Sequence, residues 1–183
     1  MSSRVTGWTI EGIHEDGLAD SDIVLVRVRT AAETATAPGT LEPNTLPPFV
    51  YVTRALRFGL TWEVETTIRR ATPPGVATVV EVPLLPGEAV TTPDVRIAGG
   101  KVVVNLDAAE MEQQWRSILP QGDKVTLVAG DVPSVAEVWY ADASPIWHVE
   151  ASGIPTIHDP SAYASRVRRW NPWPGESVAL TIT

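Results

Sequence analysis

The stretch from Val50 to Ile68 alternates large apolar residues with small or polar ones, and this pattern constrains the fold more than any other feature of the chain. Every even position carries a large apolar side chain except Arg54 and Thr66. Because successive side chains of a β-strand point to opposite faces, the pattern predicts a strand with one buried face. Such a strand would measure roughly 60 Å, whereas a domain of this chain length has a radius of gyration of roughly 16 Å. We therefore expect the strand to bend or break, and Gly59 is the expected place.

Other segments of the chain have the same strand-like character. Two β-prone runs flank Gly99-Gly100, which is the pattern of a two-residue β-hairpin. Residues 35–48 are polar and rich in proline, so we expect a loop or linker there. Besides the alternating stretch, the segments expected to form strands are residues 22–30, 95–106, 124–130, 135–142, 145–152 and 178–183.

The segment 107–119 allows two interpretations. Asp107, followed by Glu110, is typical of the capped start of a helix. Apolar residues then follow at helical spacing, namely Met111, Trp115 and Ile118. Because the segment lies between predicted strands, it could equally form an edge strand with Trp115 pointing inward. The sequence alone leaves helix and strand open.

Two short motifs occur twice and in the same order. Residues 86–90 and residues 174–178 both read Pro-Gly-Glu, a small residue and Val, and each follows a Trp-x-Val-Glu stretch, at residues 62–65 and 147–150. Proline followed by glycine predicts a tight turn, so we expect each Pro-Gly-Glu to lead directly into a strand. The second of these strands would be residues 177–183, with its apolar face in the core. The repetition indicates either duplicated β modules or two ordinary motifs that recur independently.

These patterns together predict an all-β fold, a two-sheet antiparallel β-sandwich. We expect one β-rich module over residues 1–183. The alternative is two quasi-equivalent halves, small β domains over residues 1–93 and 94–183. The chain has no cysteine, so disulfides contribute nothing to either arrangement.

The charge of the chain argues against nucleic acid as a partner. The formal net charge is −8, and no basic stripe is present to neutralise phosphates. The one basic cluster, Arg166, Arg168 and Arg169, is expected to be a solvated turn. No apolar run approaches the roughly 20 residues that cross a bilayer, so we expect a soluble chain without direct membrane insertion.

No group of residues has the pattern of a catalytic or metal site. His148 and Glu150 would share one face of a strand, and His158 and Asp159 could approach from the following loop. The spacing matches no zinc motif, and we interpret His148 and Glu150 as a solvated strand face. We predict that the chain is not an enzyme, with no catalytic residues, no metal and no cofactor.

Tryptophan is unusually frequent and indicates one class of ligand. Trp62 and Trp147 are in register with inward apolar neighbours, so we expect both in the core. Trp170 and Trp173 flank an Asn-Pro pair in a predicted loop and are the expected exposed candidates for ligand binding. Exposed tryptophans can stack on sugar rings, so a carbohydrate-binding β-sandwich is one interpretation.

The last third of the chain resembles a known class of sequence. The resemblance rests on Trp139, on Trp147-His148-Val149-Glu150, on Gly153-Ile154-Pro155 and on Trp173-Pro174-Gly175-Glu176. It is to β-rich extracytoplasmic segments of large, uncharacterised proteobacterial inner-membrane proteins. The resemblance implies a place on the periplasmic side of the inner membrane, within a longer parent chain. No activity or catalytic residue comes with it.

The sequence therefore predicts a non-catalytic structural or interaction module of a larger cell-envelope protein. Its expected partners are other proteins or the remaining domains of the parent chain. Carbohydrate binding through Trp170 and Trp173 is the alternative.

Overall fold

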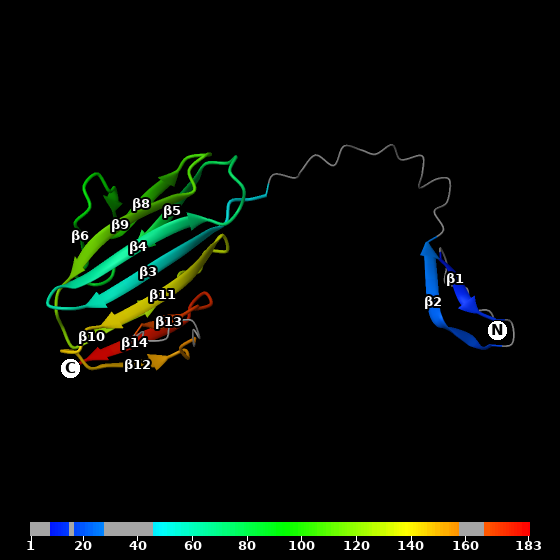
Figure 1. Ribbon diagram of the computed structural model, residues 1–183. Helices are drawn as coiled ribbons and strands as arrows, with labels where there is room; N and C mark the ends of the chain where they lie inside the picture. Colours follow the sequence, from blue (N-terminus) through cyan, green and yellow to red (C-terminus); the bar gives the residue numbers. More distant parts are fainter. Residues whose placement is uncertain (1–7, 15–16, 28–45, 158–166) are drawn as a thin grey trace. The chain divides into compact units, whose positions relative to one another are not determined.

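A computed structural model describes residues 8–14, 17–27, 46–157 and 167–183 (Figure 1). These residues form strands, turns and loops with no helix among them, which confirms the all-β prediction. The chain divides into two compact units, residues 1–44 and residues 45–183. The alternative boundary between residues 93 and 94 lies inside the second unit.

The first unit contains a two-stranded antiparallel sheet, β1 (Trp8–Ile13) and β2 (Ala19–Arg27). Between the two strands, the Gly17 backbone N–H donates a hydrogen bond to the His14 carbonyl at 3.0 Å. The predicted strand at residues 22–30 is confirmed as far as residue 27. Residues 28–30 and the part of the predicted linker at 35–45 lie outside the described residues.

The second unit is built on a six-stranded sheet with the order β13-β11-β3-β4-β9-β6. Hydrogen bonding is antiparallel between all neighbours in this sheet except β11 and β3. The strands are β3 (Val50–Phe58), β4 (Trp62–Arg70), β6 (Ala89–Val90), β9 (Glu112–Leu119), β11 (Val135–Ala143) and β13 (Arg168–Trp170).

Two three-stranded sheets form the opposite layer, with the orders β10-β14-β12 and β5-β8-β7. Their strands are β5 (Thr78–Pro83), β7 (Ile97–Ala98), β8 (Lys101–Leu106), β10 (Lys124–Val128), β12 (Val149–Gly153) and β14 (Ser177–Ile182). One buried cluster joins β10-β14-β12 to part of the six-stranded sheet, and a second cluster joins β5-β8-β7 to another part. The predicted two-layer sandwich is confirmed, with its second layer divided into two sheets.

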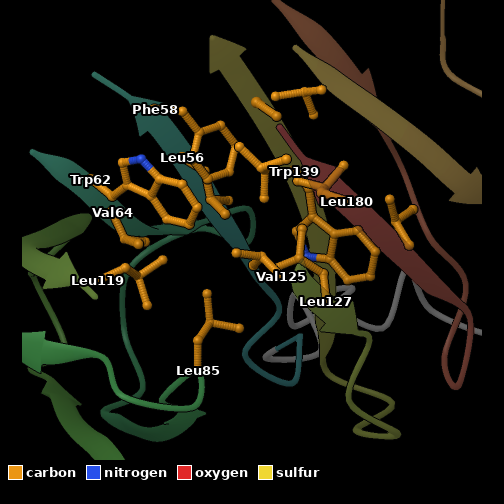
Figure 2. Packing of buried hydrophobic residues seen from close by; sticks show 14 of the residues in the cluster. Leu56, Phe58, Trp62, Val64, Leu85, Leu119, Val125, Leu127, Trp139 and Leu180 are labelled. Atoms are coloured by element: carbon orange, nitrogen blue, oxygen red, sulfur yellow. The ribbon is translucent and has the colours of Figure 1, made fainter. Parts of the chain in front are cut away.

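The alternating stretch breaks where the sequence predicted. β3 ends at Phe58 and β4 begins at Trp62, so Gly59 lies in the turn between two paired strands. The even residues of both strands point inward, and Figure 2 shows those that pack against β14 and its neighbours. Leu60 was expected on the buried face, but it is 86% exposed because it lies at the tip of this turn.

The pairing of β3 with β11 is parallel, which the prediction of an antiparallel sandwich did not include. The chain leaves the six-stranded sheet after β9, forms β10 in the opposite layer and returns as β11. A crossover of this kind allows a returning strand to run in the same direction as its new neighbour.

Within the segment 107–119, residues 112–119 form strand β9, so the strand interpretation is confirmed for this part. The Asp107 and Glu110 pattern forms a turn, in which the Asp107 N–H donates to the Glu110 carboxylate at 3.3 Å. Trp115 is buried opposite Thr66 of β4. Pairing with β4 supplies the backbone hydrogen bonds that a helix would otherwise provide.

The two Pro-Gly-Glu turns are built identically. The Glu88 carboxylate accepts a hydrogen bond from the Leu85 N–H at 2.7 Å, and the Glu176 carboxylate accepts one from the Trp173 N–H at 2.8 Å. The glycines have φ values of 77° and 80°, a backbone conformation that glycine adopts without steric cost. Each turn leads into a strand, β6 and β14 respectively, as predicted.

The two repeated stretches nevertheless occupy different places in the sandwich. After the first turn, β6 adds two residues to the edge of the six-stranded sheet beside β9. After the second turn, β14 forms the centre of a three-stranded sheet and pairs with both β10 and β12. The strand pairings therefore do not repeat between the two halves, although the turns do.

Replacing Gly153 with alanine is expected to destabilise the second unit by about 2–3 kcal/mol. Gly153 has a φ of 114°, and a Cβ built on it would lie 2.2 Å from the Ser177 carbonyl oxygen. The matched control is Gly175→Ala, where φ is 80° and no heavy atom lies within 4 Å of the added Cβ, so the cost should be only about 1 kcal/mol. Urea denaturation of both variants checks this, and equal losses would contradict it.

Candidate functional site

Trp170 is buried, so its predicted exposure is wrong. It lies in β13 opposite Trp139 of β11, and both indole rings point into the core with 0% exposure. The sequence did not indicate the burial of Trp170, because β13 has only three residues and therefore shows no alternating pattern. Trp173 is 76% exposed beside the second Pro-Gly-Glu turn, as expected. Ligand binding at Trp173 stays a prediction.

The two other tryptophans of interest contribute to the core, as predicted. Trp62 is buried, and Trp147 packs against the same cluster with its ring centroid 5.6 Å from that of Trp62. The Trp147 Nε1–H donates a hydrogen bond of 2.8 Å to the Gly59 carbonyl. The position and orientation of the Trp147 indole are therefore well defined.

The suspected metal ligands do not form a cluster within the described part of the chain. His148 Nε2 lies 3.4 Å from Glu150 Oε1, and both side chains are exposed. His158 and Asp159 lie outside the described residues. No group of three potential His, Asp or Glu ligands occurs among the residues that the structure describes.

A buried arginine occupies the inner face of the six-stranded sheet. Arg54 is 5% exposed and lies on β3 between Val52 and Leu56, which belong to the two different buried clusters. Its guanidinium donates to the Pro83 carbonyl, and its Nη1 lies 3.9 Å from Glu88 Oε2. The sequence signal was the interruption of the apolar alternation at this residue.

Burial and neighbouring charge act in opposite directions on Arg54. Burial lowers the pKa of its guanidinium from the usual value, while the carboxylates of Glu88 and Glu137 raise it. The first Pro-Gly-Glu turn thus places a carboxylate beside the only buried charge on β3. We assign this group a structural role at the junction of the two buried clusters.

A cavity of about 480 Å³ opens at the end of the sandwich where β3 and β11 finish and β12 begins. We call it the end cavity. The residues that define its walls are Phe58, Ala141, Ala143, Trp147, Val149 and Arg168. The walls are mainly apolar but include the polar residues Ser144, His148 and Arg168. The volume is within the range of small-molecule sites, about 300–1,000 Å³.

The β1–β2 hairpin presents apolar side chains on both of its faces. Val24 and Val26 share one face of β2, while Ile23 and Leu25 share the other. All four side chains are between 43% and 58% exposed. Within the described residues, β2 pairs with β1 alone.

Comparison with known proteins assigns no family to the chain. Among the described residues, no helix has the length and hydrophobicity needed to cross a lipid bilayer. No family model matches the sequence, and a search of curated proteins finds no significant match.

Proposed function

We propose that this chain is a non-catalytic interaction module that binds a protein partner through the β1–β2 hairpin. The observation that carries the proposal is the exposure of apolar side chains on both faces of β2. As the resemblance of the last third implies, we place the module on the periplasmic side of an inner membrane, as part of a larger cell-envelope protein.

A two-stranded hairpin by itself leaves the four branched apolar side chains of β2 exposed. Such hairpins are marginally stable by themselves, and stable β-structure requires further strands or a covering layer. A strand that is apolar on both faces is typical of a sheet covered on both sides. Contiguous exposed apolar surface marks interaction sites in soluble proteins. These features support a partner that covers both faces of the hairpin.

The expected partner is itself a β-sheet. The edge of β2 that faces away from β1 has no strand beside it within the described residues, so its backbone groups can accept an added strand. Addition of strands from a partner sheet would pair this edge and cover the apolar faces together. The partner is another protein or another domain of the parent chain.

Photo-crosslinking in the native host tests this proposal. A benzophenone amino acid at Val24 and one at Leu25 report on the two faces of β2, and the same probe at Leu60, which is more exposed than either, serves as a control in the second unit. We expect the two hairpin probes to give one discrete adduct of the same mass, and the Leu60 probe to give none.

A substitution distinguishes binding from random contact. Leu25→Asp should abolish the adduct formed by the Val24 probe, because it places a carboxylate on the other covered face. The melting temperature of the second unit should not change. Adducts of equal yield at Leu60, or an adduct that survives Leu25→Asp, would count against the hairpin as the binding element.

A further inference from the structure

We propose that the end cavity binds a small organic anion, a molecule with an apolar body and one carboxylate-type group, and that Arg168 holds the anionic group. The site is formed entirely by the second unit and does not depend on the hairpin proposed above.

The cavity exists because the inward residues of β11 become small toward its end. The odd residues of this strand face the core, and they change from Trp139, which is fully buried, to Ala141 and Ala143. These alanines lie beside Leu56 and Phe58 of β3 in the parallel register. The space that a larger side chain would fill remains open between the two layers.

Arg168 reaches this space from the neighbouring edge strand. On β13, Arg168 and Trp170 share the inward face, and Arg168 lies opposite Ala141. Its side chain is half-buried, and it makes no hydrogen bond or ion pair with any residue that the structure describes. A carboxylate matches the geometry of a guanidinium with paired hydrogen bonds, so Arg168 is suited to hold an anionic group.

The part of the cavity wall formed by Trp147 is apolar, and two contacts fix the orientation of its ring. Trp147 is held by its hydrogen bond to the Gly59 carbonyl and by its edge-to-face contact with Trp62. Phe58 and Val149 also belong to the apolar lining. Because the Trp147 side chain is already fixed, binding an apolar group against it costs little further conformational entropy.

The combination of these walls defines the class of ligand. A simple inorganic anion would satisfy Arg168 but leave the apolar surface uncovered. A neutral hydrocarbon would cover that surface but leave the guanidinium without a partner. The His148 side chain has a polar partner in Glu150 at 3.4 Å, whereas the Arg168 side chain has none among the described residues.

Titration with sodium octanoate and 1-octanol tests the proposal, because the two probes share an apolar body and differ in charge. We expect octanoate to bind the full chain with a dissociation constant in the millimolar range or below. The indole Nε1–H resonance of Trp147 should shift on binding, while that of the exposed Trp173 should not. 1-Octanol should bind at least tenfold more weakly than octanoate.

Two substitutions separate the roles of charge and cavity. Arg168→Gln should weaken octanoate binding about 10- to 100-fold and leave 1-octanol binding unchanged, consistent with a charged hydrogen bond. The matched control is Arg169→Gln on the outer face, where the guanidinium lies over Tyr140, and binding should not change. Ala143→Leu, at a partly buried wall position, should abolish binding of both probes.

Inward charges on edge strands also discourage sheets from pairing edge to edge. If octanoate fails to shift Trp147, or if Arg168→Gln binds octanoate as well as the unmodified chain does, Arg168 protects the sheet edge and holds no ligand. Far-ultraviolet circular dichroism of each variant confirms that loss of binding is not loss of fold.

Discussion

Deletion of residues 177–183 is expected to abolish the cooperative unfolding transition of the second unit. The deleted segment contains β14, which pairs with β10 on one side and β12 on the other. Val178, Leu180 and Ile182 are all buried, and their burial contributes about 5–9 kcal/mol before entropy losses. Whole domains are stable by only about 5–15 kcal/mol, so the remaining chain should not hold a folded sandwich. Differential scanning calorimetry measures the transition.

Single substitutions in β14 provide the control. Leu180→Ala should cost about 2–5 kcal/mol, because it leaves a cavity in the core beneath the six-stranded sheet. Thr181→Ala, one residue along and on the exposed face, should change the free energy of unfolding by less than about 0.5 kcal/mol. A truncated protein that still melts within a few degrees of the full chain would show that β14 is peripheral.

Removal of the charge at Glu88 is expected to cost the second unit about 3–5 kcal/mol. The Glu88 side chain is 1% exposed and that of Arg54 is 6% exposed, so Glu88→Gln leaves a buried guanidinium without its carboxylate. Glutamine retains an oxygen that can accept the Leu85 N–H, so the turn itself is preserved. Urea denaturation measures the loss.

The second Pro-Gly-Glu turn supplies a matched control for this experiment. Glu176 accepts the same turn hydrogen bond, from Trp173, but among the described residues no cation lies within ion-pair distance of it. Glu176→Gln should therefore cost less than about 1 kcal/mol. Arg54→Met combined with Glu88→Gln should recover most of the lost stability, because no unpaired charge then remains buried. Equal losses at Glu88 and Glu176 would contradict the role of the ion pair.

Local sequence pattern determined which residues face the core in the long strands. The alternation around Gly59 predicted two strands with inward even residues, and β3 and β4 have this arrangement. The Gly99-Gly100 hairpin and the strand after the second Pro-Gly-Glu turn were predicted equally well. These features depend on the two-residue period of a strand and on the backbone freedom of glycine, which act over a few neighbouring residues.

Tertiary structure decided everything that depends on which strands become neighbours. Residues 112–119 became a strand because β4 offered them a pairing edge, and Trp170 became buried because β13 pairs with β11. The parallel pairing of β3 with β11 joins residues far apart in the chain, and no local pattern encodes it.

The β1–β2 hairpin and the end cavity also differ in whether the sequence alone predicts them. The apolar character of β2 can be read from the sequence, because all four residues are consecutive. The end cavity cannot, because it requires two alanines of β11, a tryptophan before β12 and an arginine of β13 to meet at one end of the sandwich. A strand pattern specifies the face to which a side chain points, whereas only long-range packing specifies what lies opposite that side chain.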